Sequence, residues 1–352
     1  MRMQYAFLTL ILTFFLSFAH AVPNWMTSQI QEDLASYQEN KILRSKVLEV
    51  FNQAQAPSEQ KLLVLFELKD GKLSATPDKQ VTANHHAFQS YVQSVQRLID
   101  GADLPDLIFI LTLHDGWTGS LSVPIFAPCA HTDFPGTICF PDFEALGLRY
   151  PLKDVVKKSE VRWKKKITKA FWRGSTTGAC FTRSNCYDIP RSRLVIQSLQ
   201  YPRLLNARFV NYCQFEEPSF IAEFQKKCPS SPPVSVPRHL RYRYLIDVDG
   251  NASSWSRVYW ILLSHSVLLK QASPWYQWYY KAIKPWVHYI PLAHDVSDIK
   301  DKIIWAKRND GKAHKIAQNA TNIVEGIFSE EAIRTYIVQL LKSYAACLDN
   351  DN

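Results

Sequence analysis

Two continuous apolar runs with a helical pattern between them constrain the fold of this chain most. Residues 61–68 (KLLVLFEL) and 107–113 (LIFILTL) have the length and composition of buried strands, and turn residues follow each of them. Between the runs, residues 85–99 carry apolar side chains at helical spacing. Because strand, helix and strand in succession form the unit of a parallel sheet with crossover helices, we expect an α/β fold in the first half.

The same patterns predict elements along the rest of the chain. Residues 118–148 are rich in Pro, Gly, Cys and aromatic side chains, which predicts irregular loops over the sheet. In the second half, residues 243–247 and 266–270 are typical of strands. The expected helical segments are 27–55, 85–99, the basic stretch 153–169, a helix ending at 260–263, and 330–347.

Length and composition indicate a globular protein of two domains. The chain has 352 residues, of which 47% are hydrophobic, and roughly 150 residues make a domain. We place the domains at residues 22–160 and 161–352. Charged residues at 21% and aromatic residues at 13% exclude wholesale disorder and fibrous architectures. The net charge of +9 suits a phosphate-bearing ligand but is too evenly spread to indicate nucleic acid.

Residues 1–21 predict a secretory signal peptide. Arg2 precedes the apolar run 6–16, and Ala19-His20-Ala21 fits a small-x-small cleavage pattern. An uncleaved membrane anchor is the alternative, but the run is shorter than the roughly 20 residues that a span needs. We therefore expect an exported protein without a membrane span after cleavage. It would be in the endoplasmic reticulum lumen or secreted in a eukaryote, and periplasmic or secreted in a bacterium.

Export makes the seven cysteines candidates for disulfides. Spacing alone does not fix connectivity, and a zinc site is the alternative use of thiols. Neither a Cys-x-x-Cys pair nor clustered His ligands occur, so we expect no metal. The pairs nearest in sequence are Cys129 with Cys139, Cys180 with Cys186, and Cys213 with Cys228, which leaves Cys347 unpaired.

Three segments carry side chains suited to chemistry. Residues 173–178 (RGSTTG) combine a guanidinium, small residues and hydroxyls that can hold phosphate oxygens, although an ordinary Gly turn has the same pattern. Residues 247–251 (DVDGN) fit either paired carboxylates on a divalent metal or a turn after a strand. Asp115 follows the strand 107–113, where α/β sheets present catalytic groups, and it is either a general base or a turn residue.

A set of runs in the second half resembles the capsule-associated-protein (CAP10) domain of glycosyltransferase family 90. This family includes secretory-pathway protein O-glucosyltransferases and fungal capsule xylosyltransferases. The resemblance extends over about residues 165–327, and the block 284–292 is the most distinctive part. The runs that carry it are FWRGS (171–175), YLIDVDGN (244–251), SVLLKQ (266–271), WYY (278–280) and KPWVHYIPL (284–292).

The resemblance implies a fold, a reaction and site residues. The fold is of the GT-B type, in which two Rossmann-like domains face a cleft: residues 22–160 on the acceptor side, and 161–352 binding a UDP-sugar. The reaction is inverting transfer of glucose or xylose to a hydroxyl of a protein (Ser) or glycan, with no metal and no cofactor. Asp115 is the expected base, and Phe140 and His288 are candidate contacts for sugar or acceptor. The expected donor-binding residues are Arg173, Gly174, Ser175, Arg191, Asp249, Gly250, Asn251, Ser256 and Arg257.

General chemistry supports these roles, and three alternatives stay open. Sugar transfer develops negative charge on the departing diphosphate, which fixed Arg and backbone donors offset. The first alternative is a transferase that builds lipopolysaccharide or capsule, and the second is a carbohydrate-binding protein without catalysis. The third keeps Asp247 and Asp249 as metal ligands. For His288, a structural hydrogen bond to neighbouring backbone is the competing interpretation.

Overall fold

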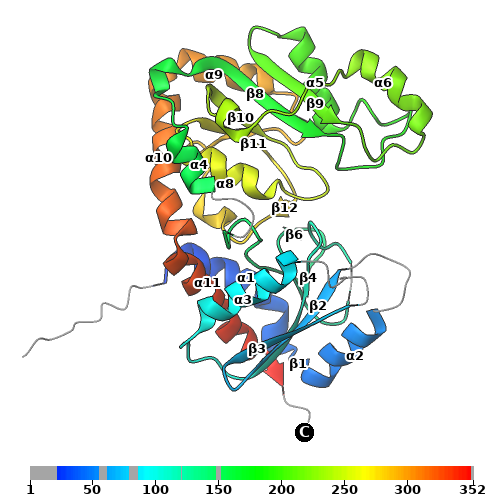
Figure 1. The fold of residues 1–352 in the computed structure, drawn as a ribbon, viewed down its shortest axis with the longest axis vertical. Helices are drawn as coiled ribbons and strands as arrows, with labels where there is room; N and C mark the ends of the chain where they lie inside the picture. The colour runs from blue at the N-terminus through cyan, green and yellow to red at the C-terminus, as the bar shows by residue number, and fades with distance from the viewer. Residues whose placement is uncertain (1–21, 55–61, 79–85, 120, 148–151, 350–352) are drawn as a thin grey trace, which may run out of the picture.

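A computed structural model describes residues 22–54, 62–78, 86–119, 121–147 and 152–349 (Figure 1). The expected signal peptide, residues 1–21, lies outside the described residues. Figure 1 shows two sheets, each with its own helices, one above the other. Mixed α/β architecture is thereby confirmed. Among the described residues, no helix is both long and apolar enough to cross a membrane.

The sheet of the second half is entirely parallel. Its strand order is β13-β11-β10-β8-β9, so the carboxyl ends of all five strands lie along one edge. Most of its strand residues are buried, as expected for a parallel sheet with helices on both faces. The strands are β8 (Ile167–Ser175), β9 (Leu205–Asn211), β10 (Tyr242–Asp247), β11 (Val267–Gln271) and β13 (Ile290–Leu292).

Helices cover both faces of this sheet. Apolar side chains of α5, α9 and the start of α10 pack on one face around Trp172. Helix α8 packs on the other face beside Phe171.

The segments 243–247, 260–263 and 266–270 were predicted as strand, helix end and strand, and all three predictions are confirmed. The helices are α5 (Pro190–Gln200), α6 (Ile221–Lys227), α7 (Val236–His239), α8 (Trp255–Leu263), α9 (Ile299–Arg308) and α10 (Asp310–Phe328).

The sheet of the first half is mixed, which corrects the expectation of parallel pairing there. Strand β2 runs antiparallel to both of its neighbours, β3 and β4. Asp70 and Gly71 have φ of 48° and 72°, the two positive values of a tight hairpin turn, and this turn sends the chain back as β3. The crossover helix α3 therefore connects β3, not β2, to β4. The elements are β2 (Leu63–Lys69), β3 (Lys72–Pro77), α3 (His86–Ile99), β4 (Leu107–Thr112), β5 (Ile125–Ala127) and β7 (Thr137–Cys139).

Three other predicted segments differ from the structure. The expected helix 27–55 is two helices, α1 (Asn24–Glu39) and α2 (Arg44–Ala54), separated by the short strand β1 (Ile42–Leu43). The loop region 118–148 contributes β5 and β7 to the sheet, because its Ile, Phe and Cys side chains are buried there. The basic stretch 153–169 is the helix α4 (Leu152–Lys158), a 3-10 turn at Trp163–Lys165 and the start of β8.

The last helix, α11 (Glu330–Ala345), was predicted from its spacing and is confirmed, but it packs on the first half. It contacts α1 and α3, and β14 (Leu348–Asp349) pairs in parallel with β1. The Tyr336 hydroxyl donates to the Cys139 carbonyl and the Tyr344 hydroxyl to the Ile108 carbonyl, each at 3.0 Å. The two halves also meet where β12 (Trp275–Tyr276) pairs antiparallel with β6 (Ala130–His131).

All seven cysteines lie in the described part of the chain, and all are free thiols. The three pairs that spacing suggested are therefore not bonded in this structure. Several of the thiols are engaged elsewhere: Cys129 Sγ lies 2.7 Å from Ser253 Oγ, and Cys213 Sγ lies 3.2 Å from the Thr176 carbonyl. Cys139 Sγ lies 3.7 Å from the Tyr276 carbonyl.

Candidate functional site

The candidate site lies where the carboxyl ends of the parallel strands meet the end of β4. Loops after β4, β8 and β10 contact one another at this point, although they come from distant parts of the sequence. The approach is close: a Cβ on Gly116, after β4, would lie 2.5 Å from the Trp275 ring. Ligand sites of α/β proteins commonly form at carboxyl strand ends.

Asp115, the expected base, is exposed at this junction. Its carboxylate Oδ2 accepts a hydrogen bond from Asn251 Nδ2 at 3.2 Å. Its main-chain carbonyl accepts one from Trp255 Nε1 at 3.0 Å. A carboxylate of the first half is thus held against the loop that follows β10 in the second half, while its exposure leaves room for a further partner.

Asn251 joins three loops. Its Oδ1 accepts hydrogen bonds from Gly178 N at 3.2 Å and from Gln214 Nε2 at 2.9 Å, while its Nδ2 binds Asp115. Gly178 has a φ of +106°, and a Cβ there would lie 2.9 Å from the Gly250 carbonyl oxygen. Only glycine tolerates both that backbone conformation and that contact. The loops after β8 and β10 therefore form one surface.

Arg191 connects the loops after β8 and β10 through hydrogen bonds. From the first turn of α5, its buried guanidinium donates to the carbonyls of Ser175 (2.9 Å), Val248 (3.1 Å) and Asp249 (2.7 Å). It also donates to Thr177 Oγ1 at 2.6 Å. Burial, together with the nearby Arg257, lowers its pKa to about 10. Arg191 was expected to bind the diphosphate, but its observed partners are three carbonyls and one hydroxyl of the loops themselves.

Arg257 lies in the first turn of α8, next to Ser256. Its Nη2 donates to the Arg173 carbonyl at 2.8 Å. The guanidinium carbons of Arg257 and Arg191 lie 6.0 and 5.6 Å from the centre of the Trp172 ring, so the structure brings two cations together. Burial lowers the pKa of Arg257. The amino end of a helix adds partial positive charge and backbone N–H donors, so this region favours an anion.

Arg173 turns its side chain elsewhere. Its Nη1 donates to the carbonyls of Trp172 at 2.7 Å and Asn206 at 3.1 Å, toward β9. Its side chain lines a cavity of about 240 Å³ that Arg238 and Arg241 also line. Only its backbone reaches the candidate site, through Arg257. The adjacent Gly174 is needed for space, since a Cβ there would lie 2.4 Å from the Trp172 ring.

The two carboxylates of the 247–251 turn are held by protein side chains. Asp247 is fully buried, and its Oδ2 lies 3.4 Å from Lys270 Nζ. Asp249 Oδ2 accepts a hydrogen bond from Ser273 Oγ, and its N–H donates to Gln271 Oε1 at 2.9 Å. Burial raises the pKa of Asp249 to about 6, although Lys270 opposes this. Each carboxylate is thus held through Oδ2 at the strand ends of β10 and β11, while its Oδ1 is buried without a hydrogen-bond partner among the described residues.

Phe140 and His288 do not lie at the junction. Phe140 is 1% exposed and packs against Phe109 and Phe126 in the core, so it has no surface for a sugar or acceptor contact. The expectation of a ligand contact there is wrong. His288 Nδ1 accepts a hydrogen bond from the Lys284 N–H at 2.9 Å, which is the structural role considered for it. It precedes β13, away from the carboxyl strand ends.

Sequence reasoning missed several residues of the site. Gln214 holds Asn251, and Lys270 and Ser273 hold the two aspartates. Thr177, in the predicted segment 173–178, holds Arg191 and was expected to bind phosphate instead. Trp255 holds the Asp115 backbone. Their common feature is position, because each lies at or just after the end of a parallel strand, or opens the helix that follows. Strand ends, which are readable from the sequence, were the available signal.

Comparison with known proteins places these features in a family. The model of "Glycosyl transferase family 90" matches residues 20–351. Human protein O-glucosyltransferase 3 is 29% identical over 258 residues, which are 69% of this chain and 47% of the human protein. Protein O-glucosyltransferase 2 of Danio rerio is also 29% identical, over 69% of this chain and 48% of its own length. This chain therefore spans about half the length of these relatives.

A solved structure also matches part of the chain. It is the crystal structure of Anabaena HepE in complex with UDP-glucose, which is 14% identical in sequence. The match covers 55% of this chain and 52% of that one, with a TM-score of 0.36.

Proposed function

We propose a specific reaction for this chain, which belongs to glycosyltransferase family 90: transfer of glucose or xylose from a UDP-sugar to a hydroxyl of a protein or glycan. In this proposal the reaction inverts the anomeric carbon and needs no metal. The observation that carries it is the hydrogen bond between Asp115 and Asn251, which joins a carboxylate of the first half to the strand-end loops of the second. This arrangement supports a GT-B type of enzyme, with the donor on one side and the base on the other.

Asp115 is proposed to be the general base. Inverting transfer is a single displacement, in which the acceptor oxygen attacks the anomeric carbon as one base removes its proton. Asp115 is exposed, so an acceptor hydroxyl can reach it, and its backbone is fixed by Trp255. Asn251 holds one carboxylate oxygen and leaves the other for the acceptor.

The departing UDP is proposed to bind at the amino end of α8. Arg257 and the backbone N–H of Ser256 would face the diphosphate, and the charge that develops there is stabilised by the guanidinium and the helix dipole. Arg191 supports this region as a positioning residue, because its hydrogen bonds fix the loops of Ser175 and Asp249. Gly250 and Asn251 would border the donor.

Two observations favour catalysis without a metal. Asp247 and Asp249 are the carboxylates suited to a divalent ion, but Lys270 and Ser273 contact the Oδ2 atom of each. The pair of guanidiniums beside Trp172 supplies positive charge that a metal supplies in other transferases.

The test measures UDP release from UDP-glucose and UDP-xylose in excess chelator, with water or a panel of proteins and glycans as acceptor. We expect the wild-type chain to release UDP, and Asp115→Asn to be slower by about 100- to 10,000-fold, the usual contribution of a general base. NMR of the sugar product should show the inverted anomer. UDP binding by the variant should be unchanged.

Asp103→Asn is the matched control, since Asp103 is exposed at the other end of β4. Equal rates for Asp115→Asn and this control would refute the role of Asp115. Loss of wild-type activity in chelator would refute metal independence, and transfer with retained configuration would refute the single displacement.

A further inference from the structure

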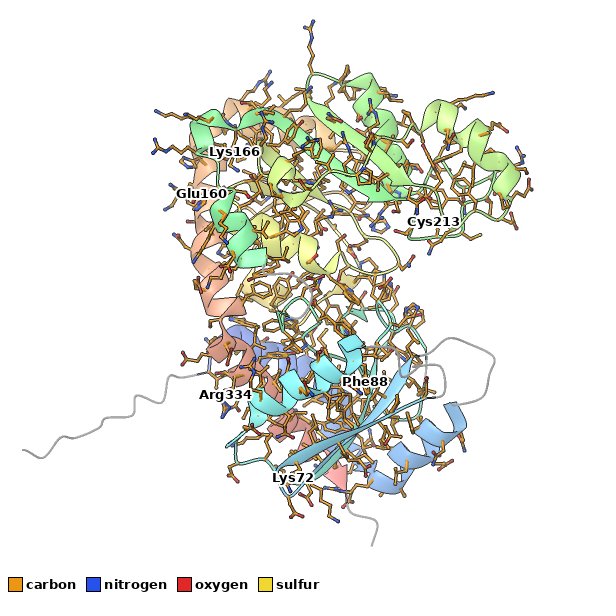
Figure 2. All side chains as sticks on the ribbon, in the orientation of Figure 1. Lys72, Phe88, Glu160, Lys166, Cys213 and Arg334 are labelled. Carbon is orange, nitrogen blue, oxygen red and sulfur yellow. The ribbon has the colours of Figure 1, made fainter. Side chains whose placement is uncertain are left out.

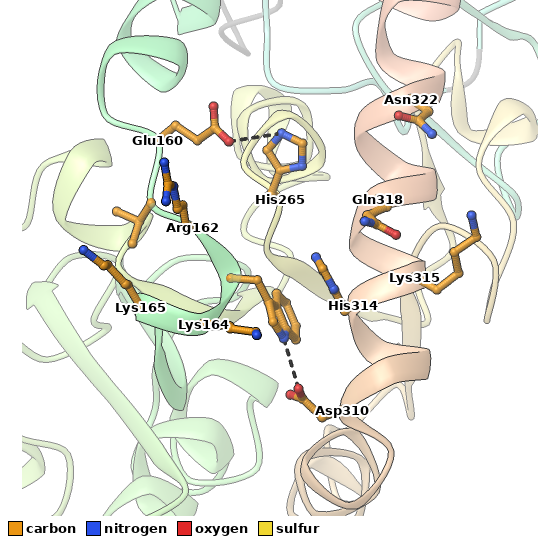
Figure 3. A pocket seen from close by; sticks show the side chains of 12 residues that line it. Glu160, Arg162, Lys164, Lys165, His265, Asp310, His314, Lys315, Gln318 and Asn322 are labelled. Carbon is orange, nitrogen blue, oxygen red and sulfur yellow. Dashed lines mark hydrogen bonds and ion pairs between the residues drawn. The ribbon is translucent and has the colours of Figure 1, made fainter.

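A second region of the molecule is hollowed and basic, and nothing in the proposed reaction uses it. It is a cavity of about 820 Å³ between the segment that precedes β8 and the helix α10 (Figure 3). We call it the basic hollow. Its lining residues are Glu160, Val161, Arg162, Trp163, Lys164, Lys165, His265, Asp310, His314, Lys315, Gln318 and Asn322.

The basic hollow lies at the opposite end of the parallel sheet from the candidate site. It borders the starts of β8 and β11, whereas Asp249 and Ser175 lie at the carboxyl ends. Figure 2 shows this separation: Glu160 and Lys166 lie on one side of the upper sheet, and Cys213, which bonds the Thr176 loop, lies on the other. A ligand in the basic hollow would therefore not overlap a donor at the candidate site.

The two carboxylates of the basic hollow lie against other side chains, and Asp310 has a cationic partner. Asp310 accepts hydrogen bonds from Arg243 Nη1 at 2.6 Å and from Trp163 Nε1 at 3.1 Å. Glu160 Oε1 lies 3.6 Å from His265 Nε2, as Figure 3 shows. Neither carboxylate contacts a lysine of the hollow in the described part of the chain.

The four cations of the basic hollow are not neutralised in the same way. Within the described ranges, no ion pair joins Arg162, Lys164, Lys165 or Lys315 to a carboxylate. All four are solvent-exposed, so a soluble anion can reach them. They come from both walls, three from the segment before β8 and Lys315 from α10. Gln318 and Asn322 add neutral amide groups on the α10 wall.

The wall that carries three of these cations is rigid. Trp163 stacks on His314 with ring centroids 4.7 Å apart, and the Arg243 guanidinium lies 5.0 Å from the centre of the same ring. Lys166 is buried, and its Nζ donates to the Leu240 carbonyl at 2.5 Å, the Ser264 carbonyl at 3.0 Å and Ser266 Oγ at 2.8 Å. Because Lys164 and Lys165 lie between these two anchored residues, their backbone positions are fixed before any ligand binds.

We propose that the basic hollow is a binding site for an organic phosphate, distinct from the donor site. Exposed cations of the segment before β8 and of α10 line one cavity, and together they match the several oxygens of a phosphate ester or diphosphate. The volume is in the range of small-molecule sites and exceeds what a single inorganic ion fills. The flanking amides suit the hydroxyls of a sugar or glycerol attached to the phosphate. Such a group reaches the protein either as a soluble sugar phosphate or as a phospholipid headgroup.

The test uses the full chain at low salt with saturating UDP, so that the donor site is occupied. Pyrophosphate titrated by calorimetry probes the soluble source, and cosedimentation with vesicles of phosphatidylcholine and phosphatidylglycerol probes the lipid source. We expect at least one probe to bind the wild type and to bind the double variant Lys164→Gln/Lys315→Gln at least tenfold more weakly. Binding should also weaken as salt is added.

Lys307→Gln/Lys312→Gln is the matched control, because both lysines are exposed on α9 and α10 outside the basic hollow. It should bind like the wild type. Binding of neither probe, or equal binding by the hollow variant and the control, would overturn the proposal. Thermal unfolding verifies that each variant is folded, and Arg162→Gln is a second, single change. If UDP itself fails to bind, the proposed donor site at α8 is refuted. The phosphate site in the basic hollow is still tested, because the hollow variant and the control are compared for binding of the probes.

Discussion

The two sheets of the molecule differ in the direction of their strands, and they contribute differently to the candidate site. The second sheet is all parallel, so five strand ends and their loops gather along one edge and supply Arg191, Asn251 and Arg257. The first sheet is mixed, and its antiparallel strands send loops to both edges. It contributes one exposed carboxylate, Asp115. A parallel sheet is suited to binding a large charged ligand, whereas a mixed sheet can supply a single reactive group.

Among the variants that test this difference between the sheets, Arg191→Met should have the largest effect on stability. The change removes a buried donor and leaves three carbonyl groups and the Thr177 hydroxyl without it. We expect the free energy of unfolding to fall by about 2–4 kcal/mol, because buried acceptors would lose their partners. Urea unfolding measures the loss. The exposed Arg203→Met on the same half is the control, and a loss no greater than that of the control would show that the loops do not depend on Arg191.

Arg257→Ala should weaken UDP binding while the fold is retained. A charge-assisted contact with the diphosphate is worth about 1.5–3 kcal/mol, which corresponds to a loss of affinity of tenfold or more. Calorimetric titration of UDP in chelator measures the difference. Arg308→Ala, exposed on α9, should bind UDP like the wild type. Unchanged affinity in Arg257→Ala would mean that the parallel sheet does not bind the donor at α8.

A pH dependence of stability is expected from Asp33 of α1. Its carboxyl is buried and accepts hydrogen bonds from the Cys139 N–H (3.0 Å) and Gln29 Nε2 (2.8 Å), and burial raises its pKa from 3.8 to about 7. Between these values the folded chain holds a proton that the unfolded chain has released. Stability should therefore be highest near pH 4 and fall toward pH 7, with a slope of at most about 1.4 kcal/mol per pH unit.

Asp33→Asn tests this pH dependence, because the amide does not titrate. Urea unfolding at several pH values between 4 and 7 should give a flatter profile for the variant than for the wild type. The exposed Asp103→Asn should keep the wild-type slope. Identical slopes in all three proteins would show that Asp33 is ionised in the folded first half.

The smallest effect is expected at Arg97, which forms an exposed ion pair with Glu330 between α3 and α11. Removal of this pair by Arg97→Ala should lower the free energy of unfolding by less than about 1 kcal/mol, as is usual for surface pairs. Tyr344→Ala, at the buried contact of α11 with β4, should cost several times more. Comparable losses would mean that the first half depends on surface charge more than on its core.

The fold could be predicted from the sequence where local pattern decides it. The bounds of β2, β4, α3 and α11 follow from apolar runs and helical spacing. The antiparallel pairing of β2 and β4 could not be predicted, because it depends on β3. Residues 72–77 (KLSATP) of β3 are largely exposed and carry no apolar run that would identify a strand. The turn residues Asp70 and Gly71 were the local sign that β3 follows β2 in a hairpin.

The sequence predicted several residues of the candidate site, but it did not predict which partner each of them has. Asp115 and Asn251 are 136 residues apart, and their contact depends on how the two halves pack. Arg191 and Arg173 could not be assigned, because most of their partners are backbone carbonyls, which have no signature in the sequence. Phe140 was misassigned for a related reason, since an aromatic side chain near a strand end serves either a ligand or the core.

The return of α11 to the first half has a consequence for the order of folding during synthesis. The hydrogen bonds of Tyr336 and Tyr344 join residues 197 and 236 positions apart, and β14 completes a pairing with β1. The ribosome therefore releases the first sheet long before the helix that closes its core exists. Contacts of such long range slow folding and leave apolar surface open in the meantime. The nascent chain would need shielding, by a chaperone or by its compartment, until α11 has emerged.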